Sequence, residues 1–116
     1  MTDTTNQQCR CLDPQDRFDS VDQTDIGVDE TKGRFGNVDL CRCEDCGQLW
    51  LHYFVEYEAF SRSGRWYRGL ITPEQATIVT PENAVALLAS LPWYFYGGSY
   101  FDTTGKQGSG QVYVDL

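Results

Sequence analysis

Cys41-Arg-Cys-Glu-Asp-Cys46-Gly-Gln-Leu-Trp-Leu-His-Tyr-Phe-Val55 lies near the middle of the 116-residue chain and contains three of its five cysteines. Residues 43–47 of this stretch form a Cys-x-x-Cys-Gly pattern, typical of a turn in which Gly47 can take the positive φ that residues with a Cβ avoid. The residues after the turn are mostly aromatic or β-branched, and both faces of an extended segment would be mainly apolar. We therefore predict a central strand that leaves a cysteine-containing turn.

The five cysteines form two groups, Cys9 with Cys11, and Cys41 with Cys43 and Cys46. The Cys-x-x-Cys turn can point two thiolates at a zinc ion about 2.3 Å away, and a closed structural site needs four ligands. We predict that Cys9, Cys11, Cys43 and Cys46 bind one structural Zn²⁺. Cys41 would share a strand face with Cys43, so it is a possible substitute for Cys9 or Cys11. Otherwise Cys41 is a small buried residue beside the site.

Two other roles for these side chains fit the sequence less well. A disulfide framework normally has an even number of cysteines and an oxidising compartment. This chain has five cysteines, and its first residues lack the basic and then apolar pattern of a signal peptide. His52 is the only histidine, and we interpret it as a half-buried strand residue because the cysteines alone suffice for a zinc site.

The turn Cys43-Glu-Asp-Cys46-Gly47 and the strand that begins at Leu49 together resemble a knuckle of the zinc-ribbon (rubredoxin-like) group. The first cysteine pair departs from that pattern because it is Cys-x-Cys, and 31 residues separate Cys11 from Cys43. The usual separation is about 15–20 residues. The resemblance covers only the metal site and its flanking strands. It implies a metal-binding fold with structural zinc and no particular activity, because the group serves transcription, RNA and protein-interaction roles alike.

Composition indicates one globular domain with a single core, since 41% of residues are hydrophobic and 22% are charged. We expect a flexible segment at residues 1–8, a zinc-binding domain at 9–116, no membrane span and a cytoplasmic location. The net charge of −8 comes from residues 1–58, which contain 13 acids and 5 bases. This half of the chain is therefore a poor partner for polyanions and a better one for a basic protein.

The remaining pattern predicts an α+β, mostly β fold with an antiparallel sheet of about four strands. We expect strands at 35–42, 48–58, 65–71 and 111–114, the second and third of them antiparallel neighbours. A capping-box sequence begins at Thr72, and an apolar stripe predicts a helix over 80–91 that covers one sheet face. We predict only a weak helix after Asp13 and a flexible segment at 102–110.

We expect the protein to act without catalysis, as an interaction domain. No second histidine is present to activate a Ser or Cys nucleophile, although an unknown enzymatic activity stays open. An acidic surface would bind a basic protein, in the manner of an inhibitor or immunity protein, and an aromatic patch is a second candidate interface. The acidic candidates are Asp16, Asp19 and Asp22, and the aromatic candidates are Tyr94, Tyr96 and Tyr100. The alternative is a nucleic-acid-binding ribbon that uses Arg62, Arg65 and Arg68. The oligomeric state is not predictable from the sequence.

Overall fold

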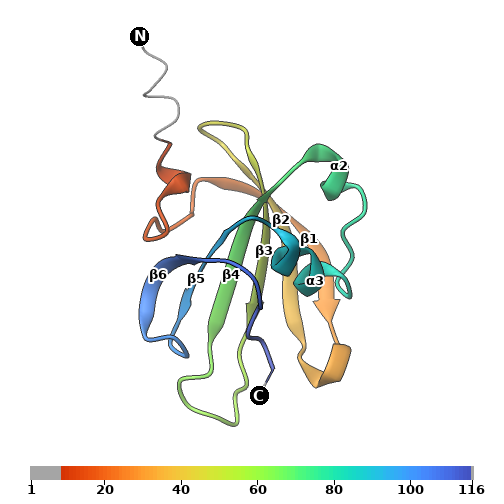
Figure 1. Ribbon diagram of the computed structural model, residues 1–116, viewed down its shortest axis with the longest axis vertical. Coiled ribbons are helices and arrows are strands. Elements are labelled where there is room, and N and C mark those ends of the chain that lie inside the picture. The colour runs from red at the N-terminus through yellow and green to blue at the C-terminus, as the bar shows by residue number, and fades with distance from the viewer. Residues whose placement is uncertain (1–8, 116) are drawn as a thin grey trace.

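The computed structural model describes residues 9–115, so the predicted flexible segment at 1–8 lies outside the described residues. Six antiparallel strands form one open sheet in chain order, from β1 to β6 (Figure 1). Their bounds are β1 Val21–Asp29, β2 Gly36–Cys43, β3 Leu49–Val55, β4 Arg65–Ile71, β5 Tyr94–Gly98 and β6 Thr103–Gly108. The mostly β, α+β prediction is confirmed, whereas the prediction of about four strands is wrong.

The central strands form where the sequence pattern placed them. In β3, Leu51, Tyr53 and Val55 are buried on one face, and Trp50 is buried on the other. The β3 strand pairs antiparallel with β4 as predicted, so that His52 lies opposite Arg68. Side chains on both faces of β3 are therefore withdrawn from water, as expected for a central strand.

Two short α-helices follow β4. α2 (Pro73–Ala76) begins at the predicted capping box, where the side chains of Thr72 and Gln75 each accept a hydrogen bond from the other's backbone N–H. α3 (Ala84–Ser90) is shorter than the predicted helix over 80–91 because Asn83 and Thr80 form a capped turn before it. The weak helix predicted after Asp13 is absent, and a 3₁₀ turn, η1 (Arg10–Leu12), lies just before it. Within residues 9–115, no helix is long and apolar enough to cross a membrane.

One face of the sheet is covered by α3 and by the C-terminal segment after β6 (Figure 1). Residues 111–114 are not the predicted strand, yet Val112 and Val114 are buried there. Side chains satisfy the backbone of this segment in place of a neighbouring strand. Tyr57 donates from its hydroxyl to the Val114 carbonyl (2.7 Å), and Tyr94 donates to that of Gln111 (2.7 Å). Polar side chains thus fix a segment that makes no ladder hydrogen bonds.

The opposite face is crossed by residues 13–20, which we call the strap. Gln15 at one end donates to the carbonyl of Gly105 in β6 (3.1 Å), and Ser20 at the other accepts from the backbone N–H of Glu44 (3.0 Å). Gly105 is required here because a Cβ at this position would overlap the carbonyl of Pro14. The predicted flexible segment 102–110 is instead mostly β6, and the strap packs across it.

Candidate metal centre

Four thiols meet where the start of the chain approaches the hairpin between β2 and β3. The Sγ atoms of Cys9, Cys11, Cys43 and Cys46 all lie within 4.8 Å of one another. Cys9 faces Cys43 at 3.7 Å, and Cys11 faces Cys46 at 3.6 Å. The structure therefore brings together the four cysteines that the sequence analysis selected.

The second pair of thiols is positioned by a tight turn. The backbone N–H of Cys43 donates to the Gln48 carbonyl (2.9 Å), and that of Gly47 donates to the Cys43 carbonyl (2.8 Å). Gly47 has a φ of 78°, as the sequence predicted, and this left-handed conformation reverses the chain. The Cys-x-x-Cys-Gly pattern thus converts directly into two thiols on one side of a hairpin.

The first pair is positioned by η1. Cys9 precedes this turn and accepts a hydrogen bond from the backbone N–H of Leu12 (2.9 Å), so that Cys9 and Cys11 point to the same side. Arg10 between them forms an ion pair with Asp45 of the β2–β3 turn (3.2 Å) and also donates to the hydroxyl of Ser20. The two arms therefore meet through side chains as well as through the thiols.

The sulfur geometry fits a tetrahedral ion better than disulfides. Four sulfurs that each lie about 2.3 Å from a central zinc ion are separated by about 3.8 Å. The closest observed pairs, at 3.6 and 3.7 Å, match that spacing. A disulfide would require about 2.05 Å. Four thiolate donors suit zinc among the divalent ions, because soft sulfur ligands and tetrahedral geometry are the preferences of Zn²⁺.

The fifth cysteine lies outside the group. Cys41 is 2% exposed and belongs to the same buried cluster as Trp50 and Phe95, on the face that the strap crosses. Burial raises the pKa of the Cys41 thiol to about 12, so it is protonated at neutral pH. The geometry therefore favours the buried-residue interpretation of Cys41 over its use as a substitute for Cys9 or Cys11.

The four clustered thiols differ in acidity. Burial raises the pKa of Cys11 well above its ordinary value. Burial opposes ionisation of Cys46 as well, but hydrogen bonds from Gln48 and Cys11 outweigh it and lower the pKa of Cys46 to about 7. Cys46 is also the exposed member of the group. Cys46 therefore loses its proton to an arriving cation more readily than Cys11 does.

Arg68 of β4 binds the backbone where η1 leads into the strap. Its guanidinium donates to the carbonyls of Cys11 (2.7 Å) and Asp13 (2.9 Å), and the residue is only 1% exposed. Aromatic rings surround the cation, with the rings of Phe18 and Trp50 centred 4.1 and 4.6 Å from it. The nucleic-acid-binding alternative requires an exposed Arg68, whereas this residue is buried. One signal could have indicated its burial: Arg68 lies on the same face of the sheet as the apolar side chain of Trp50.

The three arginines of the nucleic-acid-binding alternative do not form one basic surface, because they do not share a face. Arg65 and Arg68 are each 1% exposed and lie on opposite faces of β4, and only Arg62 is exposed, where it pairs with Asp102 (3.1 Å). Arg65 donates to the carbonyl of Tyr113 (3.2 Å) and so fixes the C-terminal segment. Two of the three arginines are therefore internal anchors.

The predicted aromatic patch is also divided. Tyr94 is 3% exposed and lies in the core beside Tyr67, whereas Tyr96 is half-buried and Tyr100 is 48% exposed. Tyr94 and Tyr96 belong to β5, which explains the burial of Tyr94, whereas Tyr100 lies in the turn after this strand. Of the acidic candidates, Asp19 and Asp22 are exposed, while Asp16 is half-buried and accepts a hydrogen bond from the backbone N–H of Phe18 (2.9 Å).

Comparisons with protein-family models, curated protein sequences and solved structures found no match to this chain. The functional interpretation therefore rests on the chain's own residues.

Proposed function

We propose that this protein is a zinc-binding interaction domain in which one structural Zn²⁺ joins the segment before the strap, which carries Cys9 and Cys11, to the β2–β3 hairpin. The observation that carries the proposal is the cluster of four thiols at tetrahedral spacing. Four sulfur ligands complete a tetrahedral shell and leave no position for a reacting water, which supports a structural role over a catalytic one. Binding energy at such a site contributes directly to folding.

The fifth cysteine provides a matched control for the metal test. The experiment measures zinc per chain, by elemental analysis and native mass spectrometry, in the wild type and in the variants Cys43→Ser and Cys41→Ser. We expect one zinc ion in the wild type, less than about a tenth of that in Cys43→Ser, and full occupancy in Cys41→Ser. Equal zinc content in the two variants, or a folded wild type that holds no metal after zinc supplementation, would contradict the proposal.

We further propose that the partner is a basic protein and that it binds the edge of the sheet formed by β1. Within residues 9–115, β1 pairs only with β2, which leaves its other edge open. Asp22 and Asp25 on this strand and Asp19 before it are exposed. Such charges deter edge-to-edge association between copies of the chain, and they favour the approach of a positively charged surface.

The partner test uses two variants with the same change in net charge. The edge variant carries Asp19→Asn, Asp22→Asn and Asp25→Asn. The control variant carries Glu56→Gln, Glu58→Gln and Glu74→Gln, all at exposed positions outside β1 and β2. In affinity capture from the source cells at low and high salt, we expect one stoichiometric basic protein whose recovery falls about tenfold in the edge variant and with salt. Equal recovery with both variants would refute the proposed surface.

A further inference from the structure

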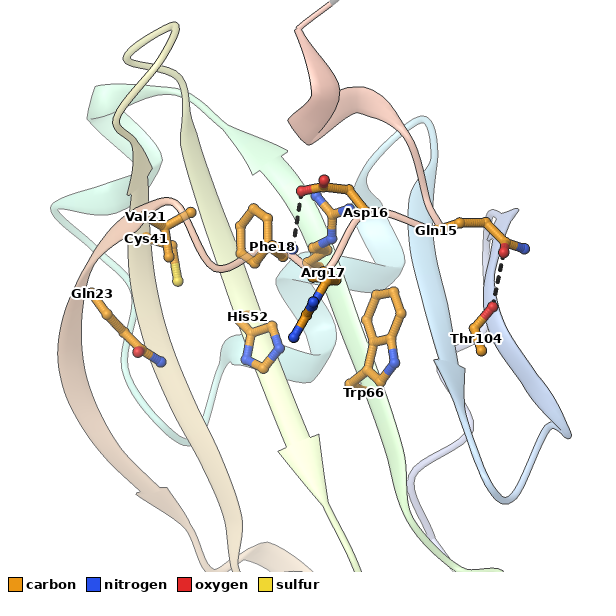
Figure 2. A pocket seen from close by; sticks show the side chains of 11 residues that line it. Gln15, Asp16, Arg17, Phe18, Val21, Gln23, Cys41, His52, Trp66 and Thr104 are labelled. Carbon is orange, nitrogen blue, oxygen red and sulfur yellow. Dashed lines mark hydrogen bonds between the residues drawn. The ribbon is translucent and has the colours of Figure 1, made fainter.

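A pocket of about 520 Å³ lies between the strap and the sheet, beside the metal centre but lined by none of the four clustered cysteines. This volume is within the range of small-molecule sites, about 300–1,000 Å³. The lining comes from the strap and from strands β1, β2, β3, β4 and β6 (Figure 2). The strap therefore creates the pocket by crossing a sheet face that would otherwise be open.

Three flat rings form its walls. The ring of His52 is nearly parallel to that of Phe18, at 17° with centroids 6.3 Å apart, and to that of Trp66, at 13° and 6.5 Å. Figure 2 shows Phe18 from the strap, His52 from β3 and Trp66 from β4 around the same space. Phe18 reaches this position with a φ of 56°, a left-handed conformation that bulky residues avoid. Parallel rings present matched surfaces to a planar ligand.

The charged residues that line the pocket are two arginines, Arg17 and Arg68, and one carboxylate, that of Asp16, in a chain of net charge −8. Arg68 lies at its inner wall, with its two terminal nitrogens already bonded to the carbonyls of Cys11 and Asp13. Arg17 extends from the strap over the pocket, toward the space between His52 and Trp66 in Figure 2. The Arg17 side chain is 90% exposed, and its carboxylate neighbour Asp19 lies 3.9 Å away, too far for a hydrogen bond. Its donors are therefore available to a ligand.

The carboxylates beside the pocket already accept hydrogen bonds from neighbouring donors. The Asp16 carboxylate accepts the backbone N–H of Phe18, and the Asp39 carboxylate accepts from the side chain of Gln23 (3.0 Å). Burial and the nearby Arg68 charge lower the pKa of His52 to about 4, so the imidazole is neutral at pH 7. No described residue hydrogen-bonds to its Nδ1 atom. A neutral ring wall and a free guanidinium at the mouth favour an aromatic anion over an aromatic cation.

We propose that this pocket binds a small planar aromatic molecule that carries an anionic group, with the rings against Trp66 and His52 and the anion at Arg17. The inference goes beyond the structural metal and the acidic edge of β1, and it requires only that the strap lies across the sheet. Zinc content and folding are measured on the same samples, so failure of the metal proposal and failure of this one are distinguishable.

The test compares three ligands with one ring system and different charge. These are naphthalene-2-carboxylate, naphthalene-2-carboxamide and naphthalen-2-ylmethylammonium, each titrated into ¹⁵N-labelled protein and followed by NMR. We expect the carboxylate to saturate with a Kd below about 1 mM and to bind about fivefold tighter than the amide, with the ammonium weakest. The shifted signals should include the indole N–H of Trp66 and backbone amides of the strap, and not the indole N–H of Trp93.

Variants of Arg17 and Trp66 test where the anionic group and the rings of the ligand bind. Arg17→Gln should weaken carboxylate binding about fivefold and change amide binding by less than about twofold, whereas the control Arg62→Gln should change neither. Trp66→Leu should weaken both ligands about tenfold, and Trp93→Leu, which removes an indole outside the pocket, should leave both nearly unchanged. If Trp66→Leu does not fold, the Arg17→Gln variant and the map of shifted signals in the wild type test whether the ligand binds in this pocket.

Three results would overturn the proposal. The first is the absence of saturable binding by the carboxylate in a folded sample. The second is a carboxylate affinity no greater than that of the amide or the ammonium. The third is a shift map centred away from the strap and Trp66.

Discussion

Replacing Arg68 with methionine removes the cation that ties the start of the strap to the sheet. The change deletes two charge-assisted hydrogen bonds, to the carbonyls of Cys11 (2.7 Å) and Asp13 (2.9 Å), and leaves both acceptors without that donor. Each such bond contributes about 1.5–3 kcal/mol. Burial opposes this gain, as it lowers the pKa of Arg68 to about 10. Methionine retains much of the apolar volume, so we expect a net loss of about 2–4 kcal/mol in the free energy of unfolding.

The matched control is Arg65→Met. Arg65 is equally buried and also donates to backbone carbonyls, those of Ser63 (3.1 Å) and Tyr113 (3.2 Å), but on the opposite face of β4. Both variants should lose stability in urea unfolding of the zinc-loaded protein, followed by tryptophan fluorescence. Only Arg68→Met should also weaken zinc binding, by about tenfold, because it frees the segment that carries Cys9 and Cys11.

Zinc affinity is measured by competition with a chromogenic chelator under conditions where both variants are folded. Equal zinc affinities in Arg68→Met and Arg65→Met would refute the coupling between this buried cation and the metal centre. An Arg68→Met protein as stable as the wild type would refute the estimate of what the two hydrogen bonds contribute.

Further predictions concern stability. Burial raises the pKa of Asp29, but hydrogen bonds from Thr31, Tyr53 and Arg34 outweigh it and hold the pKa below its ordinary value. The stabilisation is therefore complete above the unfolded-state pKa and is lost as the pH falls through the lower folded-state value. Asp29→Asn should cost about 3 kcal/mol at neutral pH and flatten the acid limb of a stability–pH profile, whereas Asp115→Asn, at a 46% exposed partner of the same arginine, should cost about 1 kcal/mol. Gly105→Ala should lower stability by about 1–3 kcal/mol in urea unfolding, because its Cβ displaces the Pro14 carbonyl, and an unchanged midpoint would contradict the close packing of the strap. Val114→Ala should cost about 1–2 kcal/mol by calorimetry, and a smaller effect would show that the C-terminal segment contributes little to the core.

The sequence predicted the middle of the sheet because β2, β3 and β4 carry their own pattern. The apolar run around Trp50 and the Cys-x-x-Cys-Gly turn depend on local chemistry, so strand, turn and thiol pair followed directly from the residues. The meeting of the four cysteines was predictable because closed zinc sites need four ligands, although spacing alone could not separate Cys41 from Cys9 and Cys11.

The outer strands were not predictable in the same way. In β1, Asp22 and Asp25 point to water, and β6 reads Thr-Thr-Gly-Lys-Gln-Gly, so neither has the apolar face that identifies a strand. Their neighbours impose the extended conformation. The burial of Arg68 was hidden for a related reason, since its hydrogen-bond acceptors are the carbonyls of Cys11 and Asp13, which lie 57 and 55 residues earlier in the chain. Contacts of that range leave no local trace in the sequence.

Every strand of the sheet pairs with the next strand in the chain, and all of these pairs except β4–β5 are joined by short connections that close at low entropic cost. The thiols of Cys9 and Cys11 meet Cys43 and Cys46 only after 31 intervening residues have been placed. We therefore expect cation capture to be the last event of maturation. In a zinc-starved cell, a newly synthesised chain would form a nearly complete sheet, but the segment with Cys9 and Cys11 would not be attached to it. The zinc supply would then determine when folding is completed.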